Sequence, residues 1–206
     1  MAKIILVTGG ARSGKSAFAE KLVESCGRRV AYIATAEIWD REMAERVGLH
    51  RNRRPDEWTT YEAPRQAEMA IAEAVVDNEV ILFDCLTVYV SNCLLALQED
   101  ARPHDRSVEV LASVEKLLDA TRQFAGTVIY VTNEVGDGIV PENRLAREFR
   151  DLAGWVNQRV AKAADEVFLV VCGLPVEIKQ RALFLPVGFS STGFISTDGS
   201  RRAASA

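Results

Sequence analysis

The stretch Gly9–Ser16, with the sequence GGARSGKS, decides the fold of this chain. It fits G-x-x-x-x-G-K-[ST], the pattern of a phosphate-binding P-loop. A short apolar run, Lys3–Thr8 (KIILVT), precedes it and is typical of a buried strand. Phe18, Leu22 and Val23 follow at helical spacing. The sequence therefore predicts a strand, a glycine loop and a helix in that order.

Such a loop is suited to bind a nucleoside triphosphate with Mg²⁺. Gly9, Gly10 and Gly14 allow backbone N–H groups to turn toward phosphate oxygens, and the helix N-terminus adds its positive dipole end. We expect Lys15 to reach the β- and γ-phosphates and Ser16 to place its hydroxyl on Mg²⁺.

The composition indicates one globular domain. The chain has 206 residues, of which 48% are hydrophobic and 26% charged, and its net charge of −4 gives no bulk reason to expect nucleic acid as a partner. The longest uncharged apolar run, Val167–Val176, is too short to span a membrane, and no signal peptide is expected. The four cysteines form no C-x-x-C pair, so we expect reduced, mostly buried thiols in a cytoplasmic protein.

Strand and helix patterns alternate along the rest of the chain. Extended segments are expected at Arg29–Thr35, Trp58–Glu62, Glu79–Asp84, Thr127–Thr132, Glu166–Cys172 and Val176–Lys179. Helices are expected at Ala36–Gly48, Pro64–Asp77, Leu86–Gln98 and Val108–Phe124 and from Pro141 onward, with Glu99–Arg106 as a loop. This alternation predicts an α/β fold, a P-loop NTPase-like, mostly parallel sheet with helices on both faces.

Polar residues occupy the carboxyl ends of these strands, where parallel sheets bind their ligands. Besides the glycine loop, they are Thr35, Asp84 and Asn133. An acid that ends a strand beside a P-loop can help Ser16 to hold Mg²⁺. Alone this signal is weak, but together with the P-loop it favours a metal-binding role for Asp84.

The segment His50–Pro55 (HRNRRP) concentrates three arginines and a histidine. It could be a solvated basic helix end, which the helix dipole favours. It could also bind phosphate, because arginines pair bidentately with phosphate oxygens, and it would then carry a nucleophilic histidine. The residues by themselves leave both interpretations open.

The composition changes near the end of the chain. Residues 180–206 are rich in glycine and serine and show no periodicity, with Phe184, Phe189 and Phe194 spaced along them. We therefore expect one domain over residues 1–179 and a C-terminal tail over 180–206, which is either disordered or docked through its aromatic residues.

Several stretches together resemble one enzyme family. They are VTGGARSGKS at 7–16, YIATAE at 32–37, HRNRRPDEWTTYE at 50–62, TNEVGDGIVPENRLAREFRDLAG at 132–154 and VNQRVAKAADEV at 156–167. The chain resembles, from Lys3 to about Lys179, the bifunctional adenosylcobinamide kinase/adenosylcobinamide-phosphate guanylyltransferases of cobalamin biosynthesis. The histidine–arginine segment and the TNEVGxGIVPENR loop are far more specific than the P-loop.

The resemblance implies two reactions at one nucleotide site. A hydroxyl of adenosylcobinamide takes the γ-phosphoryl group of ATP or GTP. Then His50 attacks the α-phosphate of GTP, and the GMP that it carries passes to adenosylcobinamide phosphate. By resemblance the nucleotide contacts fall on Gly9, Gly10, Ala11, Arg12, Ser13, Gly14, Lys15, Ser16, Ala34, Thr35, Ala36, Arg51, Asn52, Arg53, Arg54, Glu62 and Asp84. A metal or a ribose role for Asp84 stays open, and a homotrimer is implied.

Two rival functions remain at the level of sequence. One is a P-loop small-molecule kinase that does not use His50. The other is a nucleotide-dependent regulatory switch, which would hydrolyse nucleotide slowly and bind no corrinoid.

Overall fold

The computed structural model describes residues 1–37, 48, 51, 54–98 and 101–183. Its strands are β1 (Lys3–Thr8), β2 (Val30–Ala34), β3 (Thr59–Glu62), β4 (Val80–Asp84), β5 (Thr127–Val131), β6 (Glu166–Val171) and β7 (Leu174–Glu177). Its helices are α1 (Lys15–Cys26), α3 (Ala67–Ala74), α4 (Leu86–Leu95), α5 (Pro103–Arg122), α6 (Arg144–Ala163) and the 3₁₀ turn η1 (Lys179–Arg181).

The strands of the described chain form one sheet in the order β3-β2-β4-β5-β1-β6-β7. Every neighbouring pair is parallel except β6 and β7, which are antiparallel. The predicted α/β fold with a mostly parallel sheet is therefore confirmed. The strands run as near-continuous apolar segments because helices cover the sheet on both sides.

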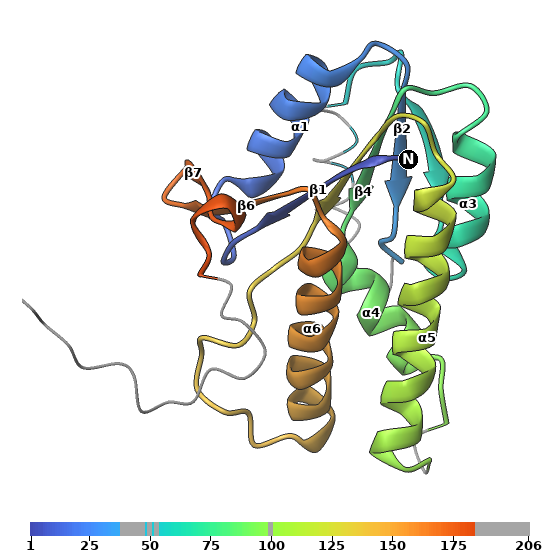
Figure 1. The fold of residues 1–206 in the computed structure, drawn as a ribbon. Helices are drawn as coiled ribbons and strands as arrows, with labels where there is room; N and C mark the ends of the chain where they lie inside the picture. Colours follow the sequence, from blue (N-terminus) through green and yellow to red (C-terminus); the bar gives the residue numbers. More distant parts are fainter. Residues whose placement is uncertain (38–47, 49–50, 52–53, 99–100, 184–206) are drawn as a thin grey trace, which may run out of the picture.

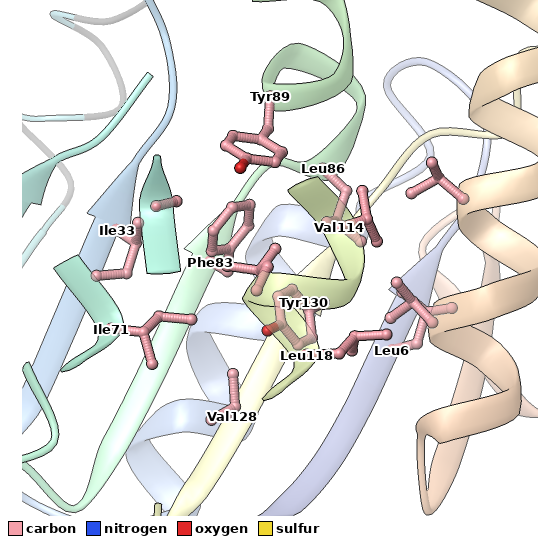
Figure 2. Close-up of a cluster of buried hydrophobic side chains, with 14 of the residues drawn as sticks. Leu6, Ile33, Ile71, Phe83, Leu86, Tyr89, Val114, Leu118, Val128 and Tyr130 are labelled. Atoms are coloured by element: carbon pink, nitrogen blue, oxygen red, sulfur yellow. The ribbon is translucent and has the colours of Figure 1, made fainter. Parts of the chain in front are cut away.

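Helices α3, α4, α5 and α6 pack on one face of the sheet and α1 packs on the other (Figure 1). The larger core lies under the four helices, where Phe83 of β4 contacts the rings of Tyr89 and Tyr130 at centroid distances of 5.7 and 5.2 Å (Figure 2). Under α1, Ala19 and Val23 are fully buried against the opposite face. In the described ranges no helix is long and apolar enough to cross a membrane.

Helices α5 and α6 begin at other residues than the sequence suggested. The predicted end of the loop Glu99–Arg106 was wrong, because α5 already starts at Pro103, and proline is favoured in the first helical turn. Helix α6 starts after Asn143 and not at Pro141, since the Asn143 side chain accepts a hydrogen bond from the N–H of Ala146 at 3.0 Å.

Smaller differences concern helix lengths and the cysteines. Helices α3 and α4 are shorter than expected. Helix α3 begins three residues after Pro64, where the sequence suggested its start. All four cysteines are free, as expected, but Cys26 and Cys172 are exposed, so the prediction of mostly buried thiols was wrong. Most of the helix predicted at 36–48, residues 38–47, and the tail from 184 onward lie outside the described residues, but Ala36 and Glu37 are described and lie in no helix, so the predicted helix start was wrong.

Candidate nucleotide site

One row of residues crosses the carboxyl edge of the sheet. Glu62 of β3 pairs with Ala34 of β2, Ala34 with Asp84 of β4, Asp84 with Val131 of β5, and Val131 with Val7 of β1. The glycine loop begins two residues after Val7. The register therefore brings the strand ends that the sequence singled out to one side of the sheet.

The strand order corrects one expectation about this row. Asp84 was expected beside the P-loop, but β5 lies between β4 and β1. Neighbouring strands are about 4.8 Å apart, so roughly 10 Å separates the backbone of Asp84 from that of β1. Asp84 nevertheless acts electrostatically on Lys15, which places both side chains in one site.

The glycine loop packs tightly against the turn that follows β6. Gly14 has φ of 95° in the left-handed region, and a Cβ there would lie 3.0 Å from Cα of Gly173. A Cβ on Gly9 would lie 2.5 Å from the carbonyl oxygen of Val170. Only glycine fits these two positions, and this lets the loop lie directly against β6 and the turn that follows it.

Lys15 turns back over this loop. Its side chain is buried, with 9% of the residue exposed, and Nζ donates a hydrogen bond to the carbonyl of Gly10 at 3.2 Å. Burial lowers the pKa of Lys15, and nearby Cys85 and Asp84 oppose that shift. The phosphates of a nucleotide bound in this loop would stabilise the charged form of this buried side chain.

Asp84 is connected to the arginine segment through Tyr32 of β2. The Tyr32 hydroxyl donates to Oδ2 of Asp84 at 2.5 Å, and the Arg54 guanidinium lies 3.4 Å from the centre of the Tyr32 ring. Burial raises the pKa of Tyr32, the Asp84 carboxylate raises it further and Arg54 opposes the shift, so Tyr32 remains a donor. This contact joins the end of the basic segment to the candidate metal ligand.

Thr35 supports the turn after β4. Its hydroxyl donates to the carbonyl oxygens of Asp84 and Cys85 at 3.1 and 3.0 Å and accepts from the N–H of Cys85 at 2.8 Å. Its own carbonyl accepts from the Asn92 side chain at 2.7 Å. The hydroxyl and the carbonyl of Thr35 are thus hydrogen-bonded within the protein, and the hydroxyl bonds fix the backbone at Asp84 and Cys85.

A second carboxylate, Glu134, follows β5. Its N–H donates to the carbonyl of Gly9 at 3.2 Å, and its Oε1 accepts from the Thr8 hydroxyl at 2.5 Å and from the Asn157 amide of α6 at 3.3 Å. Asn157 is itself held by the hydroxyl of Thr132, which donates to its Oδ1 at 2.7 Å. The loop after β5 is therefore bound directly to the start of the glycine loop.

A protein-family model described as "Cobinamide kinase / cobinamide phosphate guanyltransferase" matches residues 5–178. The chain belongs to this family. The match runs from Ile5, inside β1, to Ile178, just after β7, so it includes the site residues described above.

Curated relatives of this cobinamide kinase/guanyltransferase family member agree with the match. The bifunctional adenosylcobalamin biosynthesis protein CobU of Escherichia coli is 46% identical over 85% of this chain and 99% of its own length. The protein of the same name from Salmonella typhimurium is 48% identical, with 85% and 99% covered. CobP of Pseudomonas aeruginosa is 38% identical, with 86% and 98% covered.

The fold has more distant likenesses. An ATPase from a bacterial type III secretion system superposes with a TM-score of 0.50 at 17% identity, covering 88% of this chain and 59% of the other. At that identity the likeness concerns the fold alone, and it fits the predicted P-loop NTPase-like architecture.

The family's basic segment is only partly within the described residues. His50, Asn52 and Arg53 lie outside them. Arg51 is exposed, and Arg54 is the residue of this segment that reaches Tyr32. The predicted roles of the three undescribed residues therefore stay predictions.

The donor set of this family member suits Mg²⁺. Ser16 lies in the first turn of α1 and Asp84 ends β4, so both offer oxygen ligands on the side of the glycine loop. The described residues contain no group of three or more His, Cys, Asp or Glu side chains that could hold a metal alone. Mg²⁺ binds through one or two protein oxygens together with phosphates and water, which fits such a sparse site.

Two residues of the site were not assigned from the sequence. Tyr32 gave no signal, because an aromatic residue inside an apolar strand indicates a core position. Glu134 could have been found, since it follows the strand Thr127–Val131 in the resembling TNEVG stretch, where the strand-end rule applied to Asn133.

Proposed function

We propose that this chain phosphorylates adenosylcobinamide with ATP or GTP and then transfers GMP from GTP to the resulting phosphate, with Mg²⁺ as the metal. The product is adenosylcobinamide-GDP. The substrates follow from the family and from the names of the relatives, and the site residues give the chemistry a physical basis.

The contact between Arg54 and Tyr32 is the observation that carries this proposal. Through Tyr32 it connects the segment that contains His50 to Asp84, and Asp84 acts on Lys15 of the P-loop. A P-loop used only for a switch or for a kinase needs no such connection. A site with phosphate-binding groups on both sides can present either the γ- or the α-phosphate for attack.

The kinase half needs positioning and charge neutralisation. In the proposed complex Lys15 binds the β- and γ-phosphates, and the loop N–H groups bind the remaining phosphate oxygens. Ser16 and Asp84 would hold Mg²⁺, which would further neutralise the charge that develops during transfer. Ser13 Oγ is buried and has no hydrogen-bond partner among the described residues, so it can donate to a phosphate oxygen.

The guanylyl half needs a protein nucleophile. An imidazole has a pKa of about 6.5 and is mostly neutral at pH 7, so a ring nitrogen of His50 can attack the α-phosphorus. The bond between that phosphorus and the pyrophosphate oxygen breaks, and the arginines of the segment stabilise the leaving pyrophosphate. A phosphate oxygen of adenosylcobinamide phosphate then attacks the same phosphorus and releases the histidine.

The test compares two labels in two histidine variants. We expect His50→Ala to lose covalent, acid-labile label from α-labelled GTP while it keeps at least part of the γ-phosphate transfer to adenosylcobinamide. His104→Ala is the matched control, because His104 is the other histidine of the sequence and is exposed in the first turn of α5. It should retain both activities.

Each outcome discriminates among the functions. Label that persists in His50→Ala would place the nucleophile elsewhere. A wild-type protein that phosphorylates the corrinoid but never takes up label would be a kinase alone. Slow hydrolysis without any corrinoid product would indicate a regulatory switch.

Assembly and location are further parts of the proposal. We infer a homo-oligomer, a trimer by family resemblance, in the cytoplasm, with no nucleic-acid partner. Light scattering of the purified protein measures the assembly, and a monomeric mass across the working concentration range would contradict it.

A further inference from the structure

Glu134 lies where a proton acceptor for the kinase step would be needed. It follows β5, the strand between β1 and β4, and so stands between the glycine loop and Asp84. Three elements hold it: β1 through Thr8, α6 through Asn157 and the glycine loop through the backbone of Gly9. A side chain held from so many directions has a defined position before substrate binds.

The two oxygens of this carboxylate differ. Oε1 accepts both side-chain hydrogen bonds, from Thr8 and from Asn157. Oε2 has no protein partner among the described residues, and Glu134 is only partly buried, so a ligand can approach this carboxylate. One oxygen therefore anchors the group and the other is open to a ligand.

The anchored position lies beside the start of the glycine loop, which Lys15 also contacts. Lys15 donates to the carbonyl of Gly10, and the N–H of Glu134 donates to the carbonyl of Gly9, the preceding residue. A P-loop lysine reaches the β- and γ-phosphates. The backbone of Glu134 and the ammonium of Lys15 therefore bond to the carbonyls of two adjacent loop residues, which brings Glu134 to the part of the loop that Lys15 contacts.

We propose that Glu134 is the general base of the phosphoryl transfer, an inference that rests on the proposed kinase function. The hydroxyl oxygen of the acceptor attacks the γ-phosphorus, and the bond from that phosphorus to the β,γ-bridging oxygen breaks. The hydroxyl proton passes to Oε2 of Glu134 and then to water, and the nucleoside diphosphate leaves. The guanylyl half does not use Glu134, because its attacking groups, an imidazole nitrogen and a phosphate oxygen, carry no proton that must be removed.

Other described carboxylates near the site are occupied differently. Asp84 accepts from Tyr32 and is the candidate Mg²⁺ ligand. Glu37 pairs with Arg65 at 3.5 Å. Glu134 is the described acid that combines direct bonds to the glycine loop with an open oxygen.

The experiment uses the full-length protein with Mg²⁺, ATP and adenosylcobinamide. In Glu134→Gln the amide oxygen can still accept from Thr8, but the basic oxygen is gone, so kcat for phosphoryl transfer should fall about 100-fold or more. The nucleotide dissociation constant and the uptake of label from α-labelled GTP should stay within about threefold of wild type. Glu142→Gln, an exposed glutamate of the same loop, is the matched control and should leave kcat unchanged.

A second variant separates a chemical from a structural role. In Glu134→Ala, added formate can supply a carboxylate to the vacant position, so it should restore part of kcat in a concentration-dependent way. Near-normal kcat in Glu134→Gln, an equal loss of nucleotide binding and guanylylation, or no response to formate would each overturn the proposal. If wild type phosphorylates no corrinoid at all, the kinase function itself fails, which is a distinct result.

Discussion

At the scale of single residues, Lys15 shows how this site trades stability for binding. Its ammonium is buried beside the glycine loop with a backbone carbonyl as hydrogen-bond partner, and burial lowers its pKa. Without nucleotide, therefore, the charged form is less stable in the folded chain than in the unfolded one. A bound triphosphate would reverse this balance.

We expect Lys15→Met to abolish both proposed activities and yet to raise the free energy of unfolding of the nucleotide-free protein by up to about 1 kcal/mol. The sign of the pH dependence follows from the lowered pKa. The buried charge of Lys15 destabilises the wild type fully at pH values below the folded-state pKa of Lys15. This destabilisation disappears as the pH rises past 10.5, the ordinary pKa of lysine. Urea unfolding of both proteins between pH 7 and 10 should show their difference shrinking. A wild type that is more stable than Lys15→Met at pH 7 would contradict it.

Asp84 carries the prediction for the metal. Asp84→Ala removes a candidate Mg²⁺ ligand and also the acceptor of the Tyr32 hydroxyl, so Mg²⁺-dependent binding of GTP should weaken at least tenfold while the fold is kept. Titration calorimetry with and without Mg²⁺ measures this. Binding without the metal should change little. Equal affinity for Mg²⁺-GTP in both proteins would make Asp84 a structural residue.

At the scale of elements, a buried ion pair joins α5 to α6. Arg106 and Glu148 lie 3.3 Å apart, with 5% and 8% of their side chains exposed. Removal of one partner leaves a buried charge unpaired, which costs about 3–5 kcal/mol, whereas removal of both charges can be nearly neutral. We therefore expect Glu148→Ala to be strongly destabilising and Arg106→Met with Glu148→Leu to recover most of the loss.

A second ion pair between the same helices is the control for this prediction. Arg159 and Glu115 are 2.5 Å apart, but 43% of each side chain is exposed. Glu115→Ala should cost less than about 1 kcal/mol, because water screens the pair. Urea unfolding of the three variants measures the loss of stability in each. Equal losses for Glu115→Ala and Glu148→Ala would show that the Arg106–Glu148 pair is as hydrated as the Arg159–Glu115 pair.

At the scale of the whole molecule, the end of the described chain closes the sheet and supports the site. The N–H of Gly173, in the turn between β6 and β7, donates to the carbonyl of Ser13 at 2.8 Å. Lys179 donates to the carbonyls of Ala161, Lys162 and Ala164 at the C-terminus of α6. These contacts fall before the tail that the composition change marked.

Two truncations test where the domain ends. A chain that stops after Leu183 keeps β7, η1 and Lys179, so we expect unchanged thermal stability and both proposed activities. A chain that stops after Cys172 loses the contacts to Ser13 and to the end of α6, so it should melt at a lower temperature and bind nucleotide more weakly. Thermal unfolding and nucleotide titration measure both. A loss of guanylyl transfer in the longer, folded chain would assign a role to residues 184–206.

The sequence by itself determined the parts that local patterns encode. The strand–loop–helix order around Gly9–Ser16 and the alternation of strands with helices both follow from residues close together in the chain, and the structure confirms them. The helix starts at Pro103 and Arg144 were missed because several nearby residues could serve as the first turn. The resemblance supplied the predicted nucleotide contacts, and two of those residues, Lys15 and Asp84, lie close enough at one edge of the sheet to interact electrostatically.

Only the tertiary structure decided which strand ends meet. The cost of closing a loop depends weakly on its length, so no local pattern tells that β5 pairs between β4 and β1. That order sets Glu134 against the start of the glycine loop, and the pairing of β2 with β4 sets Tyr32 against Asp84. Whether a polar residue serves the core or the site depends on these long-range neighbours, which exist only in the folded chain.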